Sequence, residues 1–179
     1  MRINQLVWQH GGMAALISVI LSLVAYILGV ELLVGWQLGL AQSVLIITTM
    51  IVVGRAIRRD EGGFILYWRV FQHIMLSLLC ILCASTLFNY VLFNLINPEL
   101  IDVVVDLSLE KVEEMMISFG LAGDLLQETL IETEKEIRNG YSLTGSIKGI
   151  VFSSIFGAII ALIVSATLYK NDDRSPNFN

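Results

Sequence analysis

Residues 147–168 read IKGIVFSSIFGAIIALIVSATL, and this stretch decides the fold. A helix needs about 20 predominantly apolar residues to cross the hydrocarbon core of a bilayer. The stretch has that length and contains no proline, so it predicts a continuous membrane-spanning helix. Small residues recur at every fourth position in it and just before it: Gly145, Gly149, Ser153, Gly157, Ala161 and Ser165.

This spacing places the small residues on one face, where they let another helix approach closely. The first apolar run carries a similar stripe, with steps of three and four residues: Gly11, Ala15, Ser18, Ser22, Ala25 and Gly29. We expect both stripes to be helix-packing surfaces, and we expect the first and last spanning helices to pack against each other. There are two alternative interpretations of these stripes. One is that they pack against a second copy of the chain, and the other is that they form a flexible transport gate.

Three further apolar runs cover residues 11–34, 36–53 and 71–96. We predict an all-α, polytopic membrane protein with four transmembrane helices, forming a single membrane domain over residues 1–179, with the first helix retained rather than cleaved. The composition agrees, because 56% of the 179 residues are apolar and 15% are charged, with a mean hydropathy of +0.77. A soluble domain of this size could not remove so much apolar surface from water.

Charge is segregated along the chain. Residues 97–146 hold eleven acidic and three basic residues, a net charge of −8, whereas the remainder has a net charge of +3. The bases flank the spans on one side of a four-helix topology: Arg2, Arg55, Arg58, Arg59, Arg69, Lys170 and Arg174. The positive-inside tendency therefore predicts that both termini are cytoplasmic and that residues 97–146 lie outside the cytoplasm.

The acidic segment has the pattern of amphipathic helices rather than of a span. We predict three: one capped by Asn97 with Pro98 at its first position, one capped by Ser108, and one capped by Asp124 and ending at Asn139-Gly140. This extracytoplasmic acidic helical segment is interpreted as a solvated cap on the bundle. Docking of a partner protein and a divalent-cation site are the alternatives, although no EF-hand spacing occurs.

Few polar residues interrupt the spans. Gln42 and Asn89 are the principal intramembrane amides, and interhelical hydrogen bonding accounts for them without any substrate. His10 and His73 are interpreted as interfacial, with a proton-linked role as the alternative. Cys80 and Cys83 share a helix face, but two thiols make no zinc site, and we interpret them as ordinary apolar-facing residues.

No nucleophile elbow, phosphate loop, zinc motif or dinucleotide fingerprint occurs. We therefore expect no enzyme activity, cofactor, metal or nucleic acid. The leading hypothesis is a non-enzymatic subunit or accessory scaffold of a membrane complex, held in the lipid bilayer with a membrane-protein partner or another copy. The alternative is a small transporter or channel acting as a homo-oligomer.

The overall pattern resembles a known family. The segment from Glu61 to Tyr67, EGGFILY, precedes the third span, Asn97-Pro98-Glu99 closes it, and a charged helical segment and a glycine-rich last helix follow. In this the chain resembles a Bacteroidota-type bacterial domain-of-unknown-function family of small four-helix inner-membrane proteins, over nearly its full length. The resemblance implies a bacterial inner (cytoplasmic) membrane location and no assigned activity, so it supplies no functional residues.

Overall fold

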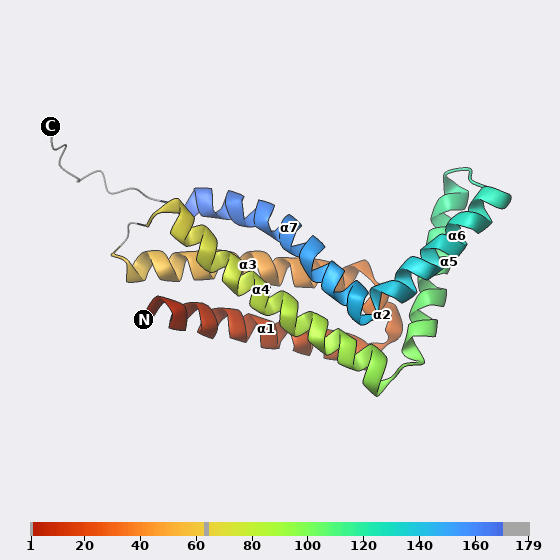
Figure 1. Ribbon diagram of the computed structural model, residues 1–179, viewed down its shortest axis with the longest axis horizontal. Helices are drawn as coiled ribbons and strands as arrows, with labels where there is room; N and C mark the ends of the chain where they lie inside the picture. The colour runs from red at the N-terminus through yellow and green to blue at the C-terminus, as the bar shows by residue number, and fades with distance from the viewer. Residues whose placement is uncertain (1, 63–64, 170–179) are drawn as a thin grey trace.

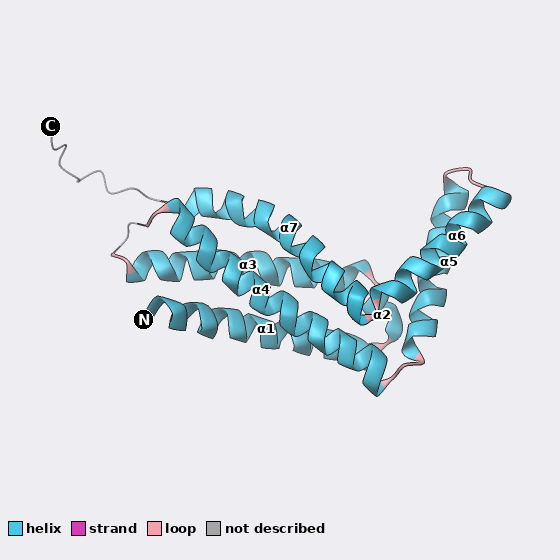
Figure 2. Cartoon of the chain, in the orientation of Figure 1, coloured by secondary structure: helices cyan, strands magenta, loops and turns pink. Residues whose placement is uncertain are grey.

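The computed structural model describes residues 2–62 and 65–169, without the side chains of residues 2–4 and 6. Every element of this part is helical (Figure 2). The elements are α1 (Arg2–Leu28), α2 (Val30–Val34), α3 (Trp36–Asp60), α4 (Tyr67–Val91), the π-helical turn η1 (Leu92–Ile96), α5 (Leu100–Ser118), α6 (Asp124–Gly140) and α7 (Leu143–Leu168).

Four stretches are long and apolar enough to cross a membrane: Val7–Leu28, Trp36–Asp60, Tyr67–Ile96 and Leu143–Leu168. The predicted all-α class is thereby confirmed, and four helices are candidate spans compatible with a multi-pass membrane protein. The observed α3 continues past the predicted end at Val53, through Gly54, and ends at Asp60. Its last turn carries Arg58 and Arg59, which the negative helix C-terminus favours.

The four spanning helices form a bundle in which α4 is central (Figure 1). Helix α4 packs against α1, α3 and α7, and α3 also packs against α1 and α7. The expectation that the first and last spanning helices pack on each other is wrong, because α1 and α7 pack on α4 instead. The largest buried cluster joins these helices through Val53, Ile57, Ile74, Leu78 and Val164, among others.

Helix α1 does not continue to Val34 as predicted. Gly29 has a φ of 141°, a conformation that glycine adopts without steric cost, and the chain turns there into the short α2. Helix α2 packs against α5, and the cluster at this end includes Val30, Leu33, Phe93 and Val104. The break therefore ties the end of the first span to the base of the acidic segment.

The acidic segment is a hairpin of two helices, not three. Ser108 lies inside α5 rather than capping a new helix, because no breaking residue occurs between Leu100 and Ser118. Helix α5 begins at Leu100, beyond the predicted cap at Asn97 and Pro98. Helix α6 runs from Asp124 to Gly140, and its N-cap is Gly123 rather than the predicted Asp124. Gly120 and Gly123 have positive φ values and form the turn. The hairpin stands at a steep angle to the bundle, at the end away from the N-terminus (Figure 1).

Candidate functional site

Gln42 is the centre of a polar cluster that joins three helices inside the bundle. Ser18 Oγ of α1 donates a hydrogen bond to Gln42 Oε1 of α3 at 2.6 Å and lies 2.6 Å from Ser85 Oγ of α4. Gln42 Nε2 donates to the backbone oxygen of Ser18 at 3.1 Å and to Ser22 Oγ at 3.3 Å. Because the single proton of Ser18 Oγ is used on Gln42, Ser85 Oγ donates to Ser18.

The hydrogen bonds of the Gln42 carboxamide are therefore met within the chain. Both amide protons are donated and the amide oxygen accepts, so the group connects helices and offers little to a ligand. The sequence pointed to Gln42 and to both serines of the α1 stripe, but it missed Ser85. A polar residue on α4 is a weak signal by itself, and only the packing of α4 on α1 identifies it.

The small residues of α1 face the bundle up to the helix break. Ala15, Ser18, Ser22 and Ala25 are buried. A Cβ at Gly11 would lie 3.2 Å from Ser77 Cα, a backbone atom of α4. Gly29 stands outside this surface, at the break that follows α1.

The small residues of α7 divide into two halves. Gly157, Ala161 and Ser165 are buried, and a Cβ at Gly157 would collide with the Leu78 side chain of α4. Gly149 and Ser153 are exposed, and a Cβ at Gly149 would meet nothing within 4 Å. Gly145 lies in the first turn, where its N–H donates to Ser142 Oγ at 3.0 Å. A Cβ at Gly145 would collide with the backbone of Asn139, so the open part of the stripe is Gly149 and Ser153.

The exposed half of this stripe lines an open groove beside α7. A cavity of about 290 Å³ near the hairpin is lined by Thr86, Asn89, Tyr90, Gly140, Tyr141, Gly145, Ser146, Gly149 and Ser153. A second cavity, of about 320 Å³, is lined by Ser43, Ile46, Ile47, Leu78, Leu82, Phe152, Ser153, Phe156, Gly157 and Ile160. Because Ser153 lines both, we treat the two cavities together as the α7 groove.

Asn89 differs from Gln42 in its surroundings. Within the described part of the chain its carboxamide has no hydrogen-bond partner, and it borders the α7 groove. Nearby, Asn94 Nδ2 donates to the backbone oxygens of Tyr90 and Tyr141, both at 3.0 Å. Tyr141 also packs on Phe93 with ring centroids 4.4 Å apart, and burial raises the pKa of its phenol. The start of α7 is therefore fixed, whereas the groove that follows it is open.

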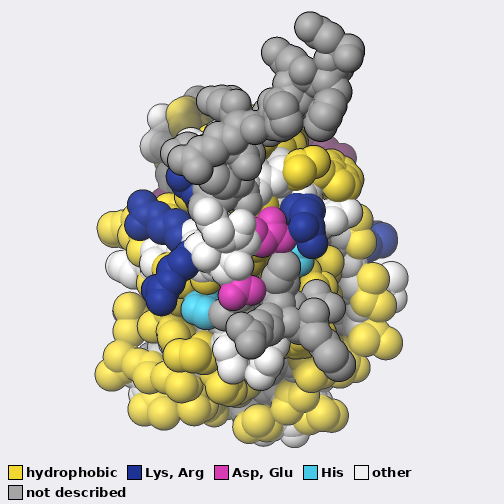
Figure 3. Space-filling model, turned by 90° about the vertical axis from the view of Figure 1, so that its left-hand side faces the viewer, with side chains coloured by type: hydrophobic (Ala, Val, Ile, Leu, Met, Phe, Trp, Pro, Cys, Tyr) yellow, Lys and Arg dark blue, Asp and Glu magenta, His cyan; other side chains and the backbone are white. Residues whose placement is uncertain are grey.

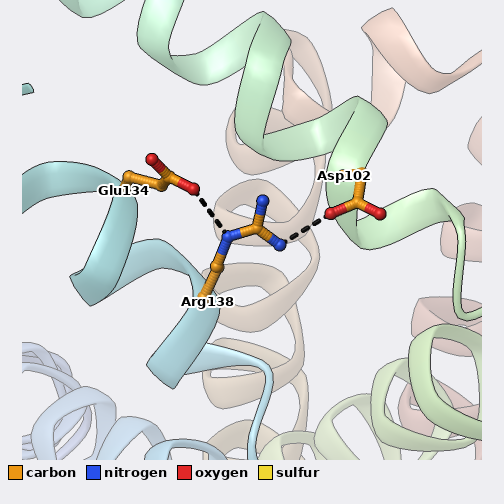
Figure 4. Close-up of polar contacts among 3 residues, drawn as sticks. All are labelled: Asp102, Glu134 and Arg138. Carbon is orange, nitrogen blue, oxygen red and sulfur yellow. Dashed lines mark hydrogen bonds and ion pairs between the residues drawn. The ribbon is translucent and has the colours of Figure 1, made fainter. Parts of the chain in front are cut away.

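Arg138 joins the two helices of the hairpin at its base (Figure 4). Its Nε donates to Glu134 Oε1 at 2.8 Å, and its Nη1 donates to Asp102 Oδ1 at 2.6 Å. The hydrogen bonds with Glu134 and then Asp102 raise the pKa of the guanidinium. This contact links the last turn of α6 to the first turn of α5.

The far end of the hairpin exposes apolar side chains between acidic residues. We call it the hairpin tip and define it by Met115, Ile117, Phe119 and Leu125, which are all more than half exposed, Phe119 to 76%. Glu113, Glu114, Asp124 and Glu128 flank them in the sequence. Exposed apolar side chains next to acidic residues form a surface that a partner could cover.

The opposite end of the bundle carries the arginines of the last turns of α3 and the first turn of α4 (Figure 3). Arg69 forms an ion pair with Glu61 at 2.8 Å, and His73 Nδ1 lies 2.5 Å from the backbone oxygen of Arg69. A cavity of about 350 Å³ is lined by His10, Ala56, Arg59 and Asp60. We call this the basic end. Lys170, Arg174, Gly63, Phe64 and the side chain of Arg2 lie outside the described residues.

Other predicted residues form no recognisable site. Cys80 and Cys83 are free thiols on α4. Among the described residues, no group of three or more histidine, cysteine, aspartate or glutamate side chains could hold a metal ion.

Comparison with known proteins adds one finding. A family profile described as "Protein of unknown function (DUF4199)" matches residues 9–170. No curated protein and no solved structure matches the chain.

Proposed function

Because the chain belongs to the DUF4199 family, whose description assigns no activity, we propose from its own geometry that it is a non-enzymatic accessory subunit of a membrane complex that binds a partner protein through the hairpin tip. The carrying observation is the exposed apolar tip on a hairpin braced by Arg138. Exposed apolar clusters with a polar rim are typical of protein interfaces.

The charge of the residues near the hairpin tip indicates what kind of partner would bind there. Acidic residues flank the tip residues in the sequence, so a partner that combines apolar and basic side chains would complement the tip. A membrane surface is a poorer fit, because anionic lipid headgroups repel an acidic segment. We therefore favour a protein partner over insertion of the tip into lipid.

The proposed orientation places the basic end in the cytoplasm and the hairpin outside it, across a bacterial inner membrane. Its support is the position of four arginines at the end of the bundle opposite the hairpin. They lie near the end of α3 and at the start of α4: Arg55, Arg58, Arg59 and Arg69. Lys and Arg accumulate in cytoplasmic loops near the ends of spans.

Site-specific photocrosslinking in intact cells tests the proposal. A photoreactive amino acid replaces Phe119 in the full-length chain, and the matched control replaces Phe152, an exposed residue of α7. We expect one defined protein adduct from position 119 only, and its loss when Glu113 and Glu114 are both changed to lysine. Absence of an adduct, together with purification of the chain as a lone species in mild detergent, would reject the proposal.

A small transporter or channel acting as a homo-oligomer is the second candidate, and the unpartnered Asn89 carboxamide beside the α7 groove favours it. This function predicts solute flux in liposomes that is lost in Asn89→Leu. Gln42→Leu is a weaker test, because the carboxamide of Gln42 joins α3 to α1 and its loss would also disturb the bundle. A chain that carries no solute but retains the position-119 adduct would exclude this candidate.

A further inference from the structure

We propose that the α7 groove binds one membrane lipid, with the lipid's glycerol-ester region at Asn89 and an acyl chain running toward Ile160. This inference concerns a different surface from the hairpin tip and is independent of the partner proposed there.

The order of polarity along the groove carries the inference. Its hairpin end is lined by the side chains of Thr86, Asn89 and Ser146, and those of Asn89 and Ser146 have no hydrogen-bond partner in the described part of the chain. The other end is lined mainly by Ile46, Leu82, Phe156 and Ile160. A lipid has the same order, from hydrogen-bond acceptors at its esters to a hydrocarbon chain.

The dimensions also fit. The two cavities have volumes of about 320 and 290 Å³. Binding sites for small ligands begin at ~300 Å³ and combine apolar walls with a few polar groups. Along α7 the groove extends from Gly145 to Ile160, about 22 Å at the helical rise. The space is therefore long and narrow, as an acyl chain requires.

The lining residues select the part of the lipid that is recognised. No lysine, arginine, aspartate or glutamate lines either cavity among the described residues. A charged headgroup would find no counter-ion there, whereas ester oxygens can accept hydrogen bonds from Asn89 Nδ2 and Ser146 Oγ. The site therefore takes the uncharged glycerol-ester region and leaves the headgroup at the membrane surface.

A second copy of the chain fits this groove less well. Phe152 and Phe156 are more than half exposed beside Ser153, with ring centroids 4.9 Å apart. Close helix packing needs small residues on both sides of the contact. The two rings keep another helix away from Gly149 but leave a slot for a chain.

Photolabelling of the purified full-length chain in nanodiscs tests the site. The probe is a phosphatidylglycerol with a diazirine on one acyl chain, diluted into unlabelled phosphatidylglycerol, and labelled residues are mapped by mass spectrometry. We expect saturable labelling concentrated on the α7 groove and lost in Gly149→Leu, which fills it. Gly39→Leu is the matched control, because a Cβ at Gly39 also meets nothing within 4 Å but Gly39 lies outside the groove. Asn89→Leu should weaken saturable labelling by about fivefold, as expected for one lost hydrogen bond.

Three results would overturn the proposal. The first is labelling spread evenly over all lipid-facing helices. The second is groove labelling that Gly149→Leu leaves unchanged while the variant keeps the helicity and elution volume of the wild type. The third is efficient disulfide formation between two copies of a Ser153→Cys chain in membranes, which would assign the groove to a second copy.

Discussion

At the scale of single residues, surroundings decide what a polar group in a membrane span does. Gln42 and Asn89 carry the same carboxamide, yet the first is hydrogen-bonded to Ser18 and Ser22, whereas the second borders a groove without a partner among the described residues. Ser18 and Ser165 form a similar pair, because both are fully buried but only Ser18 is hydrogen-bonded.

Gln42→Leu should destabilise the bundle by about 1 kcal/mol, because interhelical hydrogen bonds in membranes contribute up to about 1.7 kcal/mol. Unfolding in mixed detergent micelles, followed by circular dichroism, measures the change. Asn89→Leu serves as the matched control and should alter stability less. Equal losses for the two variants would contradict the assignment of Gln42 as the connecting amide.

Ser165→Ala should leave stability unchanged or raise it by about 1 kcal/mol, because it removes a buried hydroxyl that has no partner in the described part of the chain. Ser18→Ala removes a bonded hydroxyl and should lower stability. The same unfolding assay compares them, and a larger loss at Ser165 than at Ser18 would show that Ser165 Oγ is bonded in the native protein.

At the scale of elements, one sequence pattern has two outcomes within a single helix. Gly157 of α7 is packed against α4, whereas Gly149 and Ser153 are exposed and line a groove. In α1 the same kind of stripe meets α4 up to the break at Gly29.

Gly11→Leu should destabilise α1 packing by about 1–3 kcal/mol, the usual cost of overpacking a well-packed site. A side chain there meets the backbone of Ser77, which cannot move aside as a flexible side chain can. Gly12→Leu is the control, because a Cβ at Gly12 meets nothing within 4 Å. Similar midpoints for the two variants in the unfolding assay would argue against the α1–α4 contact.

The hairpin base should loosen when Arg138 is changed to glutamine, because α5 and α6 lose the contact between Asp102 and Arg138. Hydrogen–deuterium exchange should then become faster in the last turns of α6 and the first turns of α5. Lys135→Gln, which removes an exposed basic residue of the same helix, is the matched control. Unchanged exchange in Arg138→Gln would show that apolar packing alone holds the hairpin.

At the scale of the whole molecule, charge lies at the two ends of an apolar bundle. The arginines at the end of α3 and the start of α4 occupy one end, and the acidic hairpin occupies the other (Figure 1). This arrangement is the basis of the proposed orientation.

Labelling with a membrane-impermeant maleimide in intact cells tests that orientation. In a chain with Cys80 and Cys83 changed to alanine, Ser118→Cys should react from outside, and Asp60→Cys should react only after the membrane is opened. Both parent residues are exposed. The reverse pattern would place the hairpin in the cytoplasm.

The sequence alone determined the helical class and the four candidate spans, because a run of about 20 apolar residues can cross a bilayer stably as a helix, which satisfies its own backbone hydrogen bonds. It identified the family, since the whole pattern extends over nearly the full chain.

Only the tertiary structure decided which helices meet and which faces stay open. Periodicity shows that Gly149 and Gly157 share a face, but it does not show that α4 covers one and leaves the other exposed. It likewise did not reveal Ser85 as a partner of Ser18, or the packing of α1 and α7 on α4. The physical reason is that the spacing of residues along one helix fixes which side chains share a face. Whether that face is buried or exposed depends on where the other helices lie in space.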